Sequence, residues 1–454
     1  MKRMLAVSRT VRVHPHLRPV QIILLGFLTV ILVGTALLMT PAATAGTHSA
    51  SFIESVFTAT SAVCVTGLIL VDTATYWSGF GEAVILALIQ IGGFGVMTFA
   101  TVVGLVVMGR FSLRSKLVAA AEAKSLGLAD LRALVTGIVK ISLLIEAVLA
   151  VILTLRFMLA YDKPMGEALW QGVFHSVSAF NNAGFSLFSD SMVRFVGDPV
   201  ICLSMSGAII LGGLGFPVII QLRRHLRTPR LWSMHTRLVV WGTVVLLTLG
   251  SVMITAFEWN NPKTLGPLSL SEKVLAGFFQ SVQTRTAGFN SVDTGEMEPA
   301  TWLGIDVLMF IGGAPAGTAG GIKITTFAVL LFILVGELRG DTAVNVFGKR
   351  LSRAVHRQAI SVVLLAIALI ISCTGALMLL SSFSLDKVLF EAVSAFSTVG
   401  LSTGITAELP EAGQLILVLL MFIGRLGPIT FASALALRER SRLYELPKER
   451  PIIG

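Results

Sequence analysis

The chain alternates long apolar stretches with short polar segments, and the apolar stretches come in pairs. The pairs occupy 20–40 and 80–108, 133–160 and 199–222, 237–257 and 301–337, and 357–380 and 412–437. Each stretch reaches the roughly 20 helical residues that cross a hydrocarbon core. Between the members of each pair lies a shorter amphipathic piece of about 10–14 residues, which indicates a re-entrant segment because it cannot span. The pattern predicts eight transmembrane helices and four re-entrant helices.

A polar loop follows each re-entrant piece, and the four loops share one spacing. They read FTATSAVCVTGL (57–68), FHSVSAFNNAGF (174–185), FFQSVQTRTAGF (278–289) and FEAVSAFSTVGL (390–401). Each has a phenylalanine ten positions before a glycine, and the glycines are Gly67, Gly184, Gly288 and Gly400. A second, glycine-rich motif recurs in the second helix of each pair, at 90–99, 210–219, 310–327 and 422–431. Two features that recur in the same order predict four copies of one unit.

The predicted fold is an all-α polytopic membrane protein with four parallel helix–pore-loop–helix repeats. Four such units in one chain predict a pseudo-fourfold arrangement around one ion pore. The predicted segments are an N-terminus at 1–19, repeats at 20–110, 130–222, 237–338 and 357–437, and a tail at 438–454.

Composition supports a membrane protein and charge orients it. Charged residues make up only 13% of the chain, against about 25% in a soluble domain, and hydrophobic residues make up 54%. The net charge of +10 could suit nucleic acid, but the basic residues cluster at the N-terminus, at 110–132, 223–237 and 339–357, and in the tail. The positive-inside rule places all of these groups in the cytoplasm, together with both termini. We therefore expect contact with the lipid bilayer or a docked partner, and no nucleic acid.

Three other features of the sequence narrow the class of protein. The first apolar run follows a basic leader, but it exceeds the about 7–15 residues of a signal-peptide core, so we expect an uncleaved helix. Cys64, Cys202 and Cys373 lie far apart and are expected to be buried free thiols. No Ser/His/Asp grouping, HExxH, CxxC or phosphate-binding motif appears, which argues against an enzyme and against an organic cofactor.

The glycine loops are the candidate ion-binding site. Irregular backbone at membrane depth is tolerated only where it lines a water-filled cavity or is buried in protein, and rings of backbone carbonyls can replace the hydration shell of a cation. Glycine adopts the backbone angles that aim carbonyls inward, and the C-terminal ends of the re-entrant helices favour a cation. The candidate selectivity-filter residues are Val65, Thr66, Gly67, Asn182, Ala183, Gly184, Thr286, Ala287, Gly288, Thr398, Val399 and Gly400. Because no second glycine follows two positions after the shared one, we expect weaker discrimination between cations than in a tetrameric potassium-channel filter.

The third repeat contains a candidate gate. Its second helix carries GGAPAGTAGG at 312–321, and six glycines or prolines in ten residues cannot form a stable helix interior. The segment is expected to be unwound below the pore loops and to obstruct the pore, although a kinked, closely packed helix remains an alternative. The candidate gating residues are Gly312, Gly313, Ala314, Pro315, Ala316, Gly317, Thr318, Ala319, Gly320, Gly321, Lys323 and Arg425. Arg425 lies inside the last predicted span, where a charge is costly and usually functional. Its place at the gate or the ion path is what the family resemblance given below implies, with a helix-packing ion pair as the alternative.

Several other charged residues have expected places in the bundle or at its outer side. Arg285, inside the third loop, would repel cations in the ion path, so we expect it to point backward and brace the loop. Glu146, on the same helix as Lys140, is expected to satisfy a partner in the bundle, and Asp306 is expected near a helix start, as a cap or in an outer vestibule. Asp72, Asp190 and Asp293 follow three of the loops, where they would either concentrate cations at the mouth or be ordinary solvated loop residues.

The loop sequences TATSAVCVTGL, HSVSAFNNAGF, QTRTAGFNSVD and SAFSTVGLSTG resemble the four pore loops of the Trk/Ktr/HKT superfamily of potassium transporters, most closely the Ktr-type membrane subunit. The resemblance covers essentially the whole chain. It implies a potassium-translocating subunit of the bacterial inner membrane, with K⁺ as the transported ion at the filter glycines. It also implies a homodimer with one pore per protomer, a cytosolic ring of nucleotide-binding RCK subunits, and activation by Na⁺.

Two alternatives stay open at this level. One is a member of the same superfamily that conducts Na⁺ or co-transports Na⁺ and K⁺. The other is a secondary transporter with broken helices, which commonly has inverted repeats, whereas the parallel units predicted here favour a pore. The loops alone do not separate K⁺ from Na⁺, or channel-like flux from a symporter.

Overall fold

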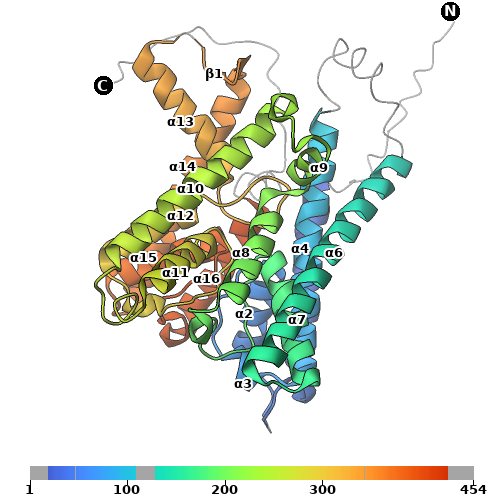
Figure 1. Ribbon diagram of the computed structural model, residues 1–454, viewed down its shortest axis with the longest axis vertical. Coiled ribbons are helices and arrows are strands. Elements are labelled where there is room, and N and C mark those ends of the chain that lie inside the picture. Colours follow the sequence, from blue (N-terminus) through green and yellow to red (C-terminus); the bar gives the residue numbers. More distant parts are fainter. Residues whose placement is uncertain (1–18, 47, 109–127, 342, 428–454) are drawn as a thin grey trace, which may run out of the picture.

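Helices account for most of the described chain, and they follow the paired pattern of the sequence (Figure 1). The structure is a computed structural model that describes residues 19–46, 48–108, 128–341 and 343–427. The helices are α1 (Pro19–Leu38), α2 (Phe52–Val63), α3 (Thr73–Tyr76), α4 (Gly79–Met108), α6 (Leu128–Tyr161), α7 (Met165–Phe180), α8 (Pro199–Leu214), α9 (Phe216–His225), α10 (Met234–Phe257), α11 (Leu270–Gln283), α12 (Pro299–Phe310), α13 (Ile324–Arg339), α14 (Arg353–Leu380), α15 (Leu385–Ser397) and α16 (Glu411–Leu426). A small antiparallel hairpin of β1 (Asn345–Val346) and β2 (Lys349–Arg350) joins α13 to α14.

The helical membrane fold is confirmed. In the described ranges, Val135–Tyr161, Met234–Phe257 and Arg353–Leu380 are each long and apolar enough to cross a membrane, and the bent pair α8–α9 could form a fourth crossing. The predicted helix at 412–437 ends at Leu426, before Gly427 with φ +85°. The predicted N-terminal segment up to residue 18, residues 428–437 and the tail at 438–454 lie outside the described residues.

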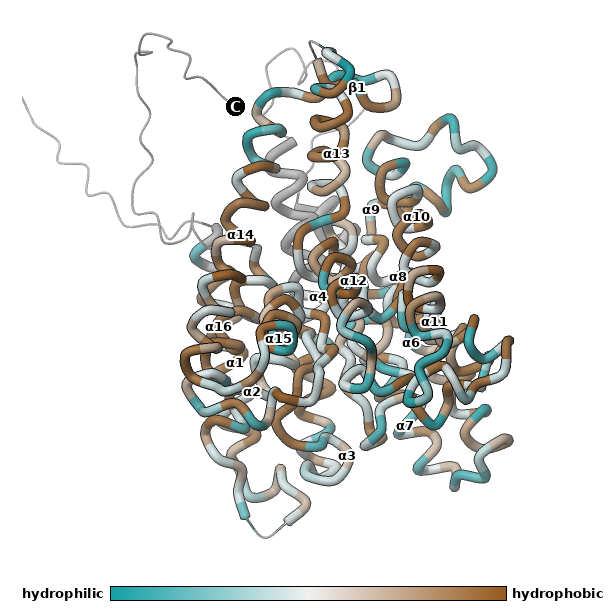
Figure 2. Tube along the Cα trace, turned by 90° about the vertical axis from the view of Figure 1, so that its left-hand side faces the viewer, coloured by the Kyte–Doolittle hydropathy of each residue, from teal (hydrophilic) through white to brown (hydrophobic). Residues whose placement is uncertain are grey.

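Surface hydrophobicity agrees with a lipid environment. Leu159 on α6 and Leu379 on α14 are 80% and 89% exposed, which water would penalise and a bilayer would not. Figure 2 shows hydrophobic residues along helices such as α10 and α14, and hydrophilic residues gathered in the loops at the two ends.

The four short helices α2, α7, α11 and α15 are the predicted re-entrant pieces, and they lie together in the lower half of Figure 1. Two of them start with a capping box. Ser51 and Glu54 bond reciprocally at the start of α2, and Ser269 and Glu272 do so at the start of α11. Such boxes satisfy the free N–H groups at a helix start, so the first residue of each of these two helices is locally determined.

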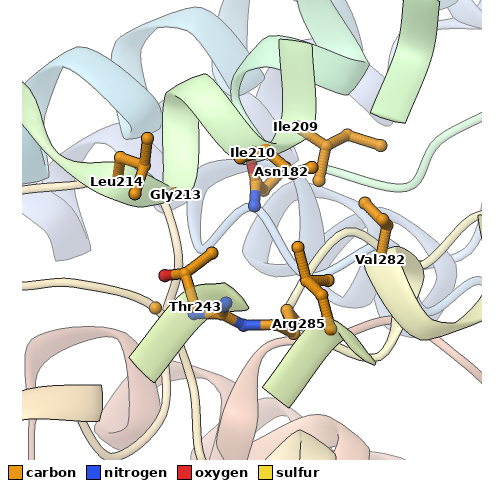
Figure 3. A pocket seen from close by; sticks show the side chains of 10 residues that line it. Asn182, Ile209, Ile210, Gly213, Leu214, Thr243, Val282 and Arg285 are labelled. Atoms are coloured by element: carbon orange, nitrogen blue, oxygen red, sulfur yellow. The ribbon is translucent and has the colours of Figure 1, made fainter. Parts of the chain in front are cut away.

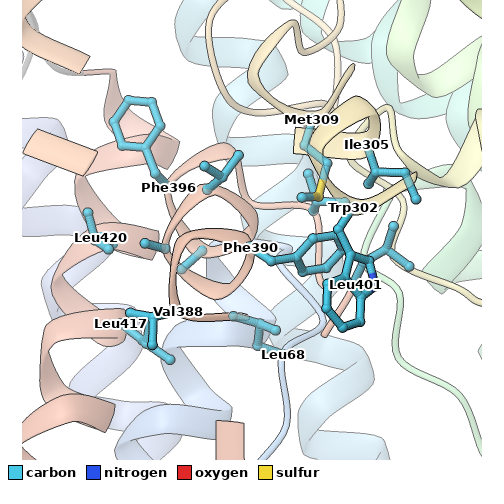
Figure 4. Close-up of a cluster of buried hydrophobic side chains, with 14 of the residues drawn as sticks. Leu68, Trp302, Ile305, Met309, Val388, Phe390, Phe396, Leu401, Leu417 and Leu420 are labelled. Carbon is cyan, nitrogen blue, oxygen red and sulfur yellow. The ribbon is translucent and has the colours of Figure 1, made fainter. Parts of the chain in front are cut away.

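The largest buried cluster packs the fourth repeat against its neighbours (Figure 4). Phe390 of α15 lies near Trp302 of α12, and Leu417 of α16 joins the same cluster. Buried rings of this size contribute most of the packing energy of a core. The re-entrant helix α15 is therefore packed between α12, α14 and α16.

Besides the shortened last helix, a second predicted helix is wrong, and a third is interrupted where the sequence indicated. The stretch at 199–222 is not continuous, because it bends by 103° between α8 and α9 at Gly215, which has φ +80°. The stretch at 301–337 is non-helical at 311–323, between α12 and α13. Pro217, which lacks an N–H, is the local signal for the first break, and the contacts that fix the bend are described below.

Candidate ion pathway

The four shared glycines lie against one another in a closed ring. A methyl group on Gly184 would lie 2.8 Å from the carbonyl oxygen of Ala287 and 3.1 Å from the Cα atom of Gly288. Gly67 faces Gly184 in the same way, Gly288 faces Gly400, and Gly400 faces Gly67. The loops therefore meet in chain order around one axis, with no room for a side chain at any of these four positions.

Each loop repeats one unusual backbone in the three residues that end at its glycine. The glycines have positive φ, and so do the non-glycine residues two positions earlier: Val65 (55°), Asn182 (60°), Thr286 (68°) and Thr398 (50°). Left-handed backbone is rare for residues with a branched β-carbon and persists only where the surroundings enforce it. We call these four three-residue segments the filter ring. The left-handed residues were missed from sequence, because valine and threonine give no signal for this conformation.

Three of the four loops are tied by a serine six residues before the glycine. The serine carbonyl accepts the N–H of the residue that precedes the glycine in each of these loops: Thr66 from Ser61 (2.7 Å), Ala183 from Ser178 (2.7 Å) and Val399 from Ser394 (2.9 Å). The hydroxyls of Ser61 and Ser394 also accept the N–H of Gly67 and Gly400, at 3.0 and 3.2 Å. The filter backbone is thus anchored to the end of its own pore helix.

The third loop uses a different tie. Val282 stands where the other loops have serine, and Gln283 takes over the bonding. Its carbonyl accepts the N–H of Ala287 at 3.0 Å, and its side chain accepts the N–H of Phe289 at 3.2 Å. One glutamine therefore performs the same task from a neighbouring position.

A buried polar cluster braces the second loop from behind. The Asn181 amide donates to Gln90 (2.9 Å) and to the Glu146 carboxylate (3.1 Å), and Gln90 donates to both Glu146 oxygens. Glu146 is 5% exposed and so has found its partners within the bundle. Lys140 is exposed on the same helix and is separate from this cluster.

Arg285 lies behind the loops rather than in the mouth of the ring. Its side chain is 8% exposed and lines a cavity of about 20 Å³ with Thr243 of α10, Ile209 of α8 and Asn182. Figure 3 shows Arg285 extending toward Thr243. Its Nε has no hydrogen-bond partner among the described residues.

A polar vestibule opens at one side of the filter ring. This cavity has a volume of about 570 Å³ and is lined by all four ring glycines and by Asp72, Asp190 and Asp293. Asp72 accepts a hydrogen bond from Ser189 at 2.5 Å, Asp190 pairs with Arg194 at 2.6 Å, and Asp293 caps a short turn through the N–H of Gly295 at 2.9 Å. The structure brings these carboxylates to the same mouth, which is where a field that attracts cations would act.

The unwound segment at 311–323, which we call the gate loop, lies on the other side of the ring. Nearly all of it is buried. It bonds to the broken end of α8, with Ala314 N–H donating to Gly213 O at 2.9 Å and Thr318 N–H donating to Gly212 O at 3.1 Å. In a continuous helix these two carbonyls would accept the N–H groups of Phe216 and residue 217, but residue 217 is a proline and has no N–H. The gate loop therefore takes over the bonds that the bend at Gly215 releases.

The gate loop also contacts the filter ring and the buried arginine. The Thr318 hydroxyl lies 3.0 Å from the Asn182 side chain, and Gly320 lies against the side chain of Thr398. Arg425 donates a hydrogen bond to the Thr318 carbonyl, and Lys323 donates to the Ala319 carbonyl at 2.6 Å. The loop is thus wedged between the first residues of two filter segments and the end of α16.

Asp306 does not take the place we expected. It is the eighth residue of α12 and is 7% exposed, so it is neither a helix cap nor part of the vestibule. Instead it borders an apolar cavity of about 600 Å³ with Phe310 and Val363. The helix starts at Pro299, eight residues earlier than a cap at Asp306 would require.

Comparisons with known proteins identify relatives over nearly the whole chain. The family of cation transport proteins named TrkH matches residues 18–443. The Ktr system potassium uptake protein B of Bacillus subtilis is 38% identical over 94% of both chains, and the potassium/sodium uptake protein NtpJ of Enterococcus hirae is 33% identical over 98% of this chain and 99% of that one. The crystal structure of the potassium transporter TrkH from Vibrio parahaemolyticus has the same fold, with a TM-score of 0.74, 17% identity, and coverage of 94% of this chain and 87% of that one.

Proposed function

The chain belongs to the TrkH family of cation transport proteins, and from this premise we propose that it is the ion-conducting subunit of a potassium uptake system. The observation that carries the proposal is the closed ring of Gly67, Gly184, Gly288 and Gly400, flanked by a vestibule on one side and a buried loop on the other. Four loops with one backbone around one axis suit a dehydrated cation, which needs oxygen ligands on all sides.

In this proposal the carbonyls of the twelve filter-ring residues bind K⁺ in place of water. The residue types support weak rather than strict selection of K⁺ over Na⁺, because the left-handed positions are not glycine. They are held by Val65, Asn182, Thr286 and Thr398. The hydroxyls of Thr286 and Thr398 are buried and have no hydrogen-bond partner among the described residues, so they are free to add ligands at the end of the ring that faces the gate loop.

The gate loop at 311–323 is proposed to close the pathway in the conformation seen here. Its contacts with Asn182 and Thr398 lie at the end of the filter ring, where an ion would leave. Arg425 holds it through the Thr318 carbonyl and adds a positive charge that opposes cation passage. Opening requires that these bonds exchange for others or for water.

Regulation is proposed to reach the gate loop through α13. This helix runs from the end of the gate loop to the β1–β2 hairpin, within the basic segment at 339–357. A cytosolic ring of nucleotide-binding RCK subunits that docks there would pull directly on the gate loop. A homodimer, an inner-membrane location with cytoplasmic termini, and activation by Na⁺ belong to the same proposal.

A second candidate function is the coupled uptake of potassium and sodium. The name of the potassium/sodium uptake protein from Enterococcus hirae includes both ions. The two candidates differ in whether sodium flux accompanies potassium flux.

Uptake into bacterial cells that lack other potassium systems tests both candidates. We expect growth at low potassium and uptake of K⁺ and Rb⁺ that external Na⁺ stimulates without entering in proportion. Uptake of ²²Na⁺ in a constant ratio to K⁺ would favour coupled transport, and failure of the chain to support any cation uptake with its cytosolic subunits present would contradict the proposal. Cross-linking from 339–357 to co-purified subunits tests the docking site.

A further inference from the structure

We propose that His175 and Glu391 are positioning residues that clamp the outgoing ends of the second and fourth loops and thereby set ion selectivity. The inference rests on the proposed function, because selectivity is its readout. Both residues lie in pore helices, nine positions before the ring glycine of their loop, and both are fully buried. Neither belongs to the filter ring or to the gate loop.

His175 holds the second loop through its ring nitrogens. Nδ1 lies 2.7 Å from the carbonyl oxygen of Gln171, which can only accept, so Nδ1 carries the proton. Nε2 is then an acceptor, and it receives the N–H of Leu187 at 3.2 Å and contacts the Ser186 hydroxyl at 3.1 Å. The ring stacks on Phe188, with the centroids 4.9 Å apart. The geometry therefore requires a neutral histidine in one tautomer.

Glu391 holds the fourth loop through both carboxylate oxygens. One oxygen accepts the N–H of Thr403 at 2.9 Å and the hydroxyl of Ser402 at 2.5 Å, and the other accepts the hydroxyl of Thr406 at 2.8 Å. These donors supply the hydrogen bonds that a buried carboxylate needs.

The two clamps are equivalent although their chemistry differs. Ser186 and Ser402 each stand two positions after the ring glycine, and Leu187 and Thr403 each stand three positions after it. In both loops the clamp receives the backbone N–H of the third position and the hydroxyl of the second. Two unlike side chains that bond the same pair of groups indicate a requirement of the loop rather than an accident of helix packing.

The other two loops have no such residue at this register. Thr58 and Phe279 stand nine positions before Gly67 and Gly288, and a phenyl ring cannot accept a backbone N–H. The third loop is held instead by the preceding repeat, where Ser191 accepts the N–H of Asn290 at 3.3 Å.

The clamped loops lie opposite each other in the ring. The contacts run from Gly67 to Gly184, Gly288, Gly400 and back to Gly67, so Gly184 and Gly400 face each other across the axis. Carbonyls that are held at a fixed separation favour one ion size, whereas carbonyls that can shift also accept a smaller ion. The clamps therefore act on the spacing between one opposed pair of ring segments.

The test compares variants that remove the hydrogen-bond acceptor at His175 or Glu391 with variants that keep one. In His175→Leu and in Glu391→Leu we expect the KM for K⁺ to rise about tenfold and the preference for K⁺ over Na⁺ to fall by a similar factor, as for one lost buried hydrogen bond. His175→Gln and Glu391→Gln keep an acceptor oxygen near the same place and should restore most of the preference. Thr58→Val, at the same register in the first loop, is the matched control and should leave both values unchanged.

The outcomes are interpretable even if the leucine variants fail to reach the membrane. His175→Asn and Glu391→Asp keep a polar side chain, but its acceptor atom no longer reaches the loop. They should therefore reproduce the loss of preference for K⁺ over Na⁺. Wild-type selectivity in these variants, or equal damage in the leucine and glutamine variants, would overturn the inference. Absence of cation uptake by the wild-type chain would instead count against the proposed function.

Discussion

Four copies of the filter segment share one backbone, whereas the four copies of the second-helix glycine motif do not. The filter segments repeat the same pair of left-handed residues and close a ring. The second helices run on in α4, break at Gly215 and at Gly427 with similar φ angles of +80° and +85°, and open into the gate loop in the third repeat. The filter segments must keep one backbone geometry because they contact one another around one axis. The second-helix motifs contact different neighbours, so their geometry is free to differ.

The glycines of the second-helix motif show where this divergence starts. In three repeats the first motif glycine packs against a carbonyl at the end of its own pore helix: Gly92 against Val63, Gly212 against Phe180 and Gly424 against Phe396. In the third repeat Gly312 packs against Gly320 of the gate loop instead. The gate loop thus replaces a helix–helix contact that the other repeats retain.

If this comparison is right, changes in the filter ring should alter ion preference, and changes in the gate loop should alter flux. The largest effect is expected for Gly184→Ser. A side chain there would meet the Ala287 carbonyl 2.8 Å away, on a backbone with φ +71°. We expect K⁺ affinity to fall about 100-fold, which corresponds to about 2.7 kcal/mol, with loss of preference over Na⁺.

The measurement is the KM for Rb⁺ uptake with competing Na⁺, and Gly400→Ser should behave alike. Gly166→Ser is the control, because no atom lies within 4 Å of a methyl group at that glycine. Unchanged uptake and ion preference in both filter variants would refute the ring as the selective element.

A smaller effect, on flux alone, is expected from shortening the gate loop. Deletion of 314–317 removes the hydrogen bonds from Ala314 to Gly213 and from Phe216 to Ala316. We expect basal ion flux to rise about tenfold, the scale of one or two buried hydrogen bonds, with ion preference retained. The measurement is flux into vesicles that contain the purified protein without cytosolic subunits.

Pro315→Ala is the matched control for this deletion, since it keeps the backbone contacts of a half-buried residue. A correctly folded deletion variant with wild-type basal flux would count against the gate. A shift in ion preference would instead show that the gate loop also affects selectivity, so that the two regions do not have separate roles.

A third test asks whether the filter ring depends on groups behind it. Glu146→Ala removes the acceptor for Asn181 and Gln90, and we expect about a fivefold rise in the KM for K⁺. Glu146→Gln retains one acceptor oxygen and should have a smaller effect. Lys140→Ala, an exposed change on the same helix, should match the wild type. Equal KM values for K⁺ in all three variants would show that the filter ring does not depend on this polar cluster.

The smallest effect is expected in the vestibule. Asp72→Asn and Asp293→Asn keep the capping hydrogen bonds to Ala74 and Gly295, because asparagine also caps. Removal of their charge should raise the KM for K⁺ about twofold at low ionic strength and leave it unchanged at high salt. An equal change at both salt concentrations would argue for a structural effect rather than attraction of cations.

Much of this architecture could be predicted from the pattern of residues. The re-entrant helices, the shared glycines and the unwound segment near 312–321 all follow from local rules of length, periodicity and glycine or proline content. Glu146 is expected to have partners, but which ones could not be derived, since Gln90 comes from the first repeat and Asn181 from the loop 35 residues later in the second. Asp306 was misplaced because its helix begins at Pro299 rather than near the aspartate.

The sequence by itself determined where the chain must turn and which positions tolerate no side chain, because glycine, proline and apolar length act within a few residues. Only the tertiary structure decided the left-handed backbone at Val65 and Thr398 and the bend at Gly215. A valine or threonine enters that conformation only when ring contacts from the other loops enforce it. The carbonyl of Gly212 could have continued a helix, whereas that of Gly213 would have faced Pro217, which has no N–H. Both bond to the gate loop about a hundred residues later because folding places its N–H groups within reach.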